Sequence, residues 1–142
     1  MFRLSGKTTI LGAPEAASSF LADVGNEPKW QNDIVHLQLL EGQAGKVGSR
    51  YERVQVVAGK NIKTVNELVE HEPGKRVVFR AVGKVIEYKV EFVLAGRGTS
   101  TDVEMKLEGE MLGFASMFEG MASDELRDAI PGNFERLKTV LK

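Results

Sequence analysis

The sequence predicts an α+β domain in which a curved antiparallel sheet of about seven strands wraps around a long C-terminal helix, with two short helices after the first strand. Two observations lead to this prediction. Several runs of alternating apolar and polar residues are separated by short glycine-containing turns, which is the pattern of antiparallel strands. Residues 111–142 instead place apolar side chains at steps of three and four, which is typical of one amphipathic helix that must cover an apolar surface.

Length and composition predict a single domain over residues 1–142. A formal net charge of -1 provides no field that would attract nucleic acid or an anionic membrane, so neither partner is expected. The chain has no cysteine, which excludes disulfides and thiolate metal sites. The sequence contains no apolar signal core and no apolar run of the roughly 20 residues that a membrane span needs, so we expect a cytoplasmic protein.

The first strand is expected at residues 2–10, where apolar and polar side chains alternate. Pro14 then begins a helix that runs to about Val24. Proline suits the first helical position because its missing N–H has no partner there, and Glu15 beside it meets the positive end of the helix dipole. Gly25 is a natural residue for the end of this helix.

A second short helix is expected at residues 26–30, capped by Asn26. It carries Trp30, the only tryptophan of the chain. Residues 34–41 form the next strand, but either of its two faces could be the buried one. The glycine-rich loop over residues 42–48 prevents a choice between them.

The register of the later strands can be propagated from residues 85–94, because this run has one apolar face and one mostly charged face. A Gly83-Lys84 turn pairs Val82 with Val85, and a loop over residues 95–98 pairs Leu94 with Thr99. The apolar side chains that this register places on the inner face are Val77, Phe79, Ala81, Ile86, Tyr88, Val90, Phe92, Leu94, Val103, Met105 and Leu107.

Two earlier turns extend the inner face to polar residues. The turn at residues 72–75 has proline and glycine at its centre, and a Gly59-Lys60 turn precedes it. The side chains that these turns place inside are Tyr51, Arg53, Gln55, Val57, Ile62, Thr64, Asn66 and Leu68. Burying Arg53 without a partner would cost several kcal/mol, so we interpret this polar face as part of a water-containing cavity or ligand pocket.

A β-bulge that changed the parity of one of these strands would reverse this result. It would bring Val54, Val56, Val65 and Val69 inside and expose Arg53. If the first register holds, these four valines join Val78 and Val82 in an apolar patch on the outer face, which would suggest a homodimer.

The sequence shows no pattern that predicts a metal, a cofactor or a catalytic nucleophile. Its two histidines, His36 and His71, have no second histidine or acid at metal-ligand spacing, so no metal site is expected. The glycines of residues 113–132 do not follow a strand as a phosphate-binding loop would, so no cofactor is expected either.

Six short segments spread over nearly the whole chain carry a resemblance to a known superfamily. They are Ala13-Pro14-Glu15, Asp23 to Trp30, Gly45 to Tyr51, Glu70 to Arg80, Gly98-Thr99 and Asn133 to Lys138. With the order of the elements, they resemble the SRPBCC or START-like superfamily, especially its bacterial polyketide cyclase/dehydrase and lipid-transport branch. The resemblance implies a helix-grip fold. It also implies an apolar ligand between sheet and helix, and in some members aldol cyclisation or dehydration there, without a universal catalytic set.

We therefore expect a module that binds a small hydrophobic or amphipathic ligand, lipid-like or polyketide-like, which enters near Trp30 and the loop at residues 42–48. The expected apolar contacts are Phe79, Tyr88, Met105, Phe114 and Phe118, while Trp30 is expected either as a lid at the cavity mouth or as the residue that fills one end of the core. The residues expected to orient the polar end of the ligand are Tyr51, Arg53, Gln55 and Asn66.

Two alternatives remain from the sequence. The first is a cyclase-type or dehydratase-type enzyme, in which Arg53 would stabilise an enolate and Tyr51 or Tyr88 would act as the acid, although no base is evident. The second is a dimeric interaction protein whose cavity is filled by its own side chains.

Overall fold

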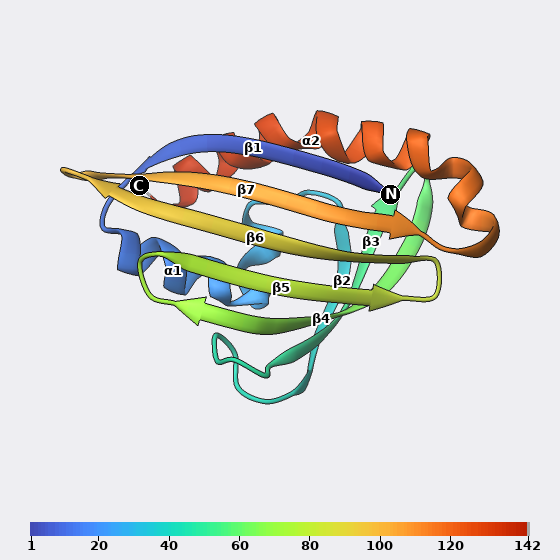
Figure 1. Ribbon diagram of the computed structural model, residues 1–142. Coiled ribbons are helices and arrows are strands. Elements are labelled where there is room, and N and C mark those ends of the chain that lie inside the picture. The colour runs from blue at the N-terminus through green and yellow to red at the C-terminus, as the bar shows by residue number, and fades with distance from the viewer. Residues whose placement is uncertain (142) are drawn as a thin grey trace.

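The computed structural model describes residues 1–141 as one seven-stranded antiparallel sheet with its helices on a single face (Figure 1). The strand order is β1-β7-β6-β5-β4-β3-β2. This arrangement confirms the predicted helix-grip fold. The elements are β1 (Phe2–Leu11), α1 (Pro14–Ala22), the 3₁₀ helix η1 (Val24–Lys29), β2 (Ile34–Glu41), β3 (Arg50–Val57), β4 (Lys60–Glu72), β5 (Arg76–Gly83), β6 (Ile86–Arg97), β7 (Ser100–Met111), the 3₁₀ helix η2 (Gly113–Phe118) and α2 (Glu119–Val140).

The predicted inner face of β5, β6 and β7 is confirmed, although the hairpins pair differently. Val82 pairs with Glu87 instead of Val85, and Leu94 pairs with Val103 instead of Thr99. Both shifts are by an even number of residues, and side chains alternate with a period of two, so the same residues stay inside. The buried core therefore includes Val77, Phe79, Ala81, Ile86, Tyr88, Phe92, Leu94, Val103 and Met105.

The polar side chains of β3 and β4 also lie on the inner face. Arg53 is 5% exposed and Asn66 is 3% exposed, whereas Val69 on the outer face is 37% exposed. A bulge does occur in β4, between Leu68 and Glu70. It lies beyond the polar residues and does not change their side, so the alternative register with Arg53 in solvent is wrong.

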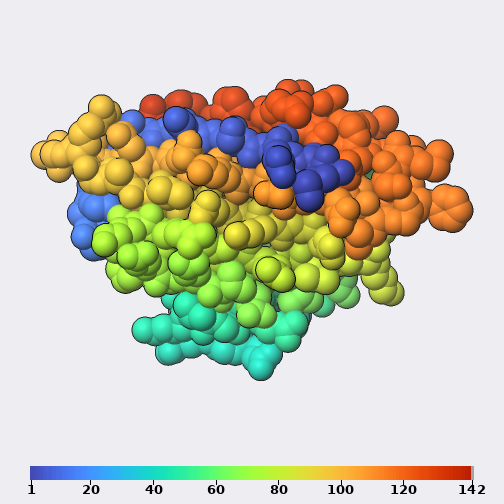
Figure 2. Space-filling view, viewed as in Figure 1, coloured from blue at the N-terminus to red at the C-terminus, as the bar shows by residue number. Residues whose placement is uncertain are grey.

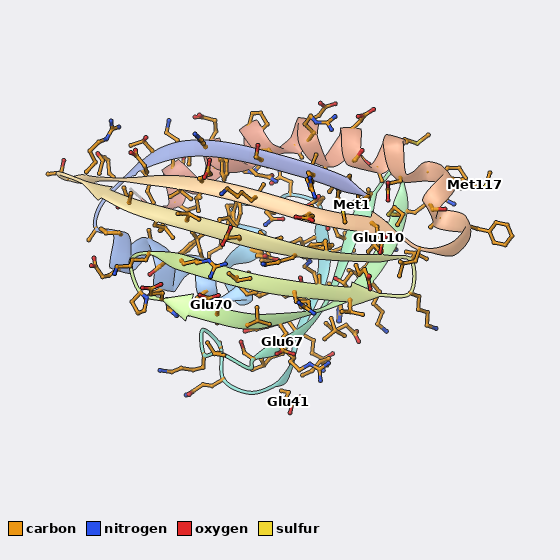
Figure 3. The ribbon with its side chains drawn as sticks, viewed as in Figure 1. Met1, Glu41, Glu67, Glu70, Glu110 and Met117 are labelled. Atoms are coloured by element: carbon orange, nitrogen blue, oxygen red, sulfur yellow. The ribbon has the colours of Figure 1, made fainter. Side chains whose placement is uncertain are left out.

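The predicted apolar patch on the outer face is divided by charged side chains. Val78 pairs with Glu70 of β4 and Glu91 of β6, and Arg76 forms ion pairs with both of these carboxylates. Val78 itself is buried within the monomer. Glu70 projects from this outer face in Figure 3, on the side turned away from the helices. The homodimer remains a prediction.

In β2, neither of the two predicted faces lies on the inner side of the sheet along the whole strand. The strand pairs with β3 and contains two register shifts, one between Ile34 and His36 and one between Leu39 and Glu41. Leu37 lies opposite Arg53 and packs against the core. The bulges explain why a simple period of two could not assign this strand.

The first helix begins at Pro14 as predicted, but the predicted cap of the second short helix is wrong. Asp23 caps η1, because its Oδ1 accepts a hydrogen bond of 2.9 Å from the backbone N–H of Gly25. The Asn26 side chain instead donates to the carbonyl of Phe20 at 3.1 Å. Asp23 thus fixes the start of the segment that carries Glu27 and Trp30.

The C-terminal helix is shorter than predicted, and part of its expected apolar stripe faces solvent. Gly113 has a positive φ of 60° and starts the 3₁₀ helix η2 before α2 begins at Glu119. Phe114 is 89% exposed, and Met117 projects from the molecule in Figure 3. Figure 2 shows the same segment protruding at one end. Lys142, the last residue of the predicted helix, lies outside the described residues.

The later part of α2 does face the sheet, and its close approach depends on Gly6. A Cβ at Gly6 would lie 2.6 Å from Cγ2 of Ile130 and 2.8 Å from the ring of Phe134. The absent side chain therefore lets α2 pack directly on β1, which holds Ile130 and Phe134 over the inner face. None of the helices within residues 1–141 combines the length and the apolar character needed to cross a bilayer.

Candidate ligand-binding site

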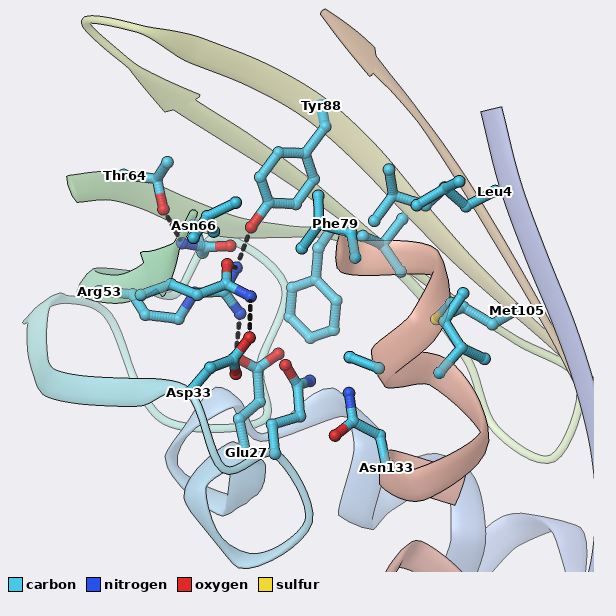
Figure 4. A pocket seen from close by; sticks show the side chains of 18 of the residues that line it. Leu4, Glu27, Asp33, Arg53, Thr64, Asn66, Phe79, Tyr88, Met105 and Asn133 are labelled. Atoms are coloured by element: carbon cyan, nitrogen blue, oxygen red, sulfur yellow. Dashed lines mark hydrogen bonds and ion pairs between the residues drawn. The ribbon is translucent and has the colours of Figure 1, made fainter. Parts of the chain in front are cut away.

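A cavity of about 70 Å³ lies between the inner face of the sheet and α2 (Figure 4). Its walls come from strands β3 to β7, from β1, from α2, from η1 and from the segment between η1 and β2. Seven of the ten predicted site residues line it, namely Trp30, Arg53, Gln55, Asn66, Phe79, Tyr88 and Met105. Most of the lining is apolar, and the polar side chains gather at one end (Figure 4).

The other three predicted site residues lie elsewhere. Tyr51 is buried, but its hydroxyl donates to Asp23 Oδ1 at 3.3 Å, outside the cavity lining. Phe114 and Phe118 are exposed on η2 and do not reach the cavity, because the chain turns away from the sheet at Gly113. The glycine-rich loop also lies apart from the cavity, since residues 44–47 line a separate surface depression.

Arg53 lies at the polar end and is neutralised by a buried partner that the sequence analysis did not identify. Its Nη1 donates to Oε1 of Glu27, which η1 carries and which is 8% exposed. Its Nη2 donates to the hydroxyl of Tyr88. The expectation that water or a ligand must solvate Arg53 is therefore corrected, because Glu27 supplies the opposite charge. Of the three guanidinium nitrogens of Arg53, Nε is the one that lacks a hydrogen-bond partner in the described structure.

Asp33, a second carboxylate missed by the sequence analysis, lies beside this pair. Its Oδ2 accepts a hydrogen bond of 2.7 Å from Nε2 of Gln55, and its backbone carbonyl accepts one of 2.8 Å from the amide of Val56. Its Oδ1 is buried without a hydrogen-bond partner in the described structure. Gln55 also accepts from Nη2 of Arg53 at 3.4 Å, so one amide connects the carboxylate with the guanidinium.

Contacts between η1 and α2 close one end of the cavity. Trp30 is 3% exposed and packs edge-on against Phe92, with 6.2 Å between the ring centroids. Nε of Arg136 on α2 donates to the backbone carbonyl of Trp30 at 3.0 Å, and Arg136 also donates to Oδ1 of Asn133. The side chain of Trp30 therefore fills the core at the end of the cavity that lies between η1 and α2.

The cavity opens between α2 and the segment that precedes β2. A neighbouring surface depression shares Asp33, Val57, Leu126, Ala129 and Asn133 with the cavity, so these residues form its mouth. The carboxylate of Glu125 on α2 accepts from the backbone N–H of Ala58, which ties α2 to the turn between β3 and β4 next to this mouth. Within residues 1–141, no three histidine, aspartate or glutamate side chains gather in a way that would hold a metal ion.

Burial raises the pKa of the Tyr51 hydroxyl above its ordinary value, and the charge and hydrogen bond of Asp23 raise it further. Replacing Asp23→Asn is expected to lower this pKa, because the negative charge is lost while an acceptor oxygen remains for the cap of η1. An ultraviolet pH titration of the two tyrosines measures the change, and Tyr51→Phe identifies the signal. An unchanged titration in Asp23→Asn would mean that the two side chains do not interact.

The sign of the pH effect on stability follows from the raised pKa. The unfolded chain loses the tyrosine proton first as the pH rises above about 10, where the folded protein still holds it. The contribution of Tyr51 is therefore fully present below this pH and is lost as the pH rises through the folded-state pKa. The free energy of unfolding should fall less steeply above this pH in Asp23→Asn.

Comparison with known proteins supports the fold and gives the family. A START superfamily protein from Mycobacterium smegmatis is 12% identical, with a TM-score of 0.79 over 98% of this chain and 96% of that one. The ginseng major latex-like protein 151 from Panax ginseng is 16% identical, with a TM-score of 0.76 over 99% and 97% of the two chains. These identities are low, so the likeness shows the fold alone.

No match was found among curated proteins. The family model described as "Polyketide cyclase / dehydrase and lipid transport" matches residues 1–142, which is the whole sequence. The structural likeness and this match agree on the same type of domain. The chain belongs to the polyketide cyclase / dehydrase and lipid transport family.

Proposed function

We propose that the protein binds a small apolar or amphipathic ligand in the cavity between the sheet and α2. The observation that carries this proposal is an apolar cavity with a cluster of buried polar groups at one end. The apolar walls favour the body of a ligand by removing it from water, and the polar groups favour one orientation. The family description, which includes lipid transport, agrees with an apolar ligand.

The size of the cavity limits the ligand. Pockets for drug-sized ligands have volumes of about 300–1,000 Å³, whereas this cavity has about 70 Å³. A ligand that binds to the protein in this conformation must therefore be small. A lipid chain would need α2 to move away from the sheet, because Leu126, Ile130 and Phe134 occupy the space beneath the helix.

The enzymatic alternative has less support. Arg53 already donates from Nη1 to Glu27 and from Nη2 to both Tyr88 and Gln55, so most of its guanidinium donors are engaged within the protein and are not directed at an enolate. The pKa of Tyr51 is raised by burial, and its hydroxyl lies outside the cavity lining. A general acid works best with a pKa near the operating pH, so Tyr51 suits this role poorly.

The test uses native mass spectrometry and a variant that fills the mouth of the cavity. Ala129 is half-buried at the mouth, and Ala16 is an exposed alanine on α1, so Ala129→Trp and Ala16→Trp make the same change at two places. We expect a small-molecule adduct on the wild type and on Ala16→Trp that denaturation removes. We expect Ala129→Trp to lose the adduct. An adduct that survives in Ala129→Trp would contradict binding in this cavity.

A further inference from the structure

Two buried polar atoms at the end of the cavity have no partner among residues 1–141. They are Oδ1 of Asp33, an acceptor, and Nε of Arg53, a donor. Both residues line the cavity, and Figure 4 shows both of them at its polar end. Buried polar atoms in folded proteins nearly always have a hydrogen-bond partner, so these two atoms indicate where a bound molecule makes its polar contacts.

The charges of this cluster are unequal. Two carboxylates, Glu27 and Asp33, line this end of the cavity together with the single guanidinium of Arg53. Glu27 forms the ion pair with Arg53, whereas the only side chain that donates to Asp33 in the described structure is the neutral amide of Gln55. Arg136 lies at the mouth, but it donates to the carbonyl of Trp30 and to the side chain of Asn133. An acidic ligand would therefore enter a site that already holds an excess negative charge.

Asp33 is also held in one position before any ligand binds. The hydrogen bond from Gln55 fixes its Oδ2, and the bond from the amide of Val56 fixes its backbone. Its free Oδ1 is thus an acceptor with little conformational freedom to lose. Binding to such a preorganised group costs little ordering entropy.

We propose that the ligand carries a hydrogen-bond donor, as an amine or an alcohol does, and that this head group donates to Oδ1 of Asp33. The inference rests on the proposed function and adds the chemical class of the ligand. A donor satisfies the unpartnered carboxylate oxygen, and a protonated amine also compensates its charge. A carboxylate offers no donor to Oδ1 and is repelled by Asp33 and Glu27.

The test compares four small molecules of similar size that differ in the head group: pentylamine, 1-pentanol, butyl methyl ether and pentanoate. Each is titrated into the ¹⁵N-labelled protein, and the shifts of the cavity amides give the affinity. We expect the amine and the alcohol to bind about tenfold more tightly than the ether and the acid, which is the effect of one good hydrogen bond to a buried charged group. Short chains suit a cavity of about 70 Å³.

The outcomes separate this inference from the proposed function. Equal affinities for all four molecules, or tightest binding of pentanoate, would overturn the donor head group and leave the cavity function standing. No binding by any of the four would overturn both. An ether that binds as tightly as the alcohol would also overturn the inference, because the ether has no proton to donate.

A charge-removing variant tests the role of Asp33 itself. Asp33→Asn is expected to lower the affinity for pentylamine about tenfold and to raise the affinity for pentanoate, while the affinity for the ether stays unchanged. Asp128→Asn makes the same change at an exposed position on α2 and should alter none of the affinities. If the Asp33→Asn variant binds pentylamine as the wild type does, the inference fails. If that variant does not fold, the head-group comparison on the wild type still decides.

Discussion

Replacing Arg53→Met is expected to destabilise the protein by about 3–5 kcal/mol, which is the usual cost of removing one partner of a buried ion pair. The two side chains are only 6% and 11% exposed, so Glu27 would keep a buried charge without its partner. Tyr88 would also lose the bond that its hydroxyl accepts. Urea unfolding followed by the fluorescence of Trp30, the only tryptophan, gives the free energy of unfolding.

A double-mutant cycle identifies the cause of this loss. Arg53→Met with Glu27→Leu replaces both charges by apolar groups, and such replacements of buried pairs are often neutral or stabilising. The double variant should therefore be more stable than Arg53→Met alone. The matched control is Arg127→Met, which removes an exposed pair with Asp124 and should cost no more than about 1 kcal/mol. Equal costs for Arg53→Met and Arg127→Met would contradict the buried pair.

The position of Arg53 could be predicted from the sequence, but its partner could not. The alternation in β3 and β4 assigns a side of the sheet to each residue, and this assignment survives any even shift in register. Glu27 lies 26 residues earlier, in a short 3₁₀ helix. No local pattern connects the two residues. A buried arginine does predict that some carboxylate must approach it, and this is the signal that points to Glu27 or Asp33.

The C-terminal stripe shows the opposite case, in which a strong local pattern misleads. Apolar residues recur at helical spacing from Phe114 onward, but periodicity cannot tell whether a surface lies opposite each of them. The sheet ends before η2 begins, and Gly113 turns the chain away with a positive φ. The same spacing therefore gives exposed side chains on η2 and buried ones at Ile130 and Phe134.

The contrast between the exposed apolar residues of η2 and the buried ones of α2 predicts a large difference in stability between two matched variants. Phe134 is 4% exposed and forms a wall of the cavity, so Phe134→Ala is expected to lower the free energy of unfolding by about 3–5 kcal/mol. Phe114→Ala removes the same atoms at a side chain that is 89% exposed, and it should change the stability by no more than about 0.5 kcal/mol. Urea denaturation of both variants gives the comparison.

The Phe134→Ala variant also enlarges the cavity where α2 covers it, so the two effects should appear together. The variant should bind an alcohol longer than 1-pentanol more tightly than the wild type does, because the removed ring leaves room beside Ile130 and Met105. Phe114→Ala should leave this preference unchanged. Similar stability losses in the two variants would mean that η2 packs on the protein in solution. A Phe134→Ala variant that is less stable but keeps the ligand size of the wild type would mean that the helix collapses into the space, since the cost of such a cavity depends on how far its walls can relax.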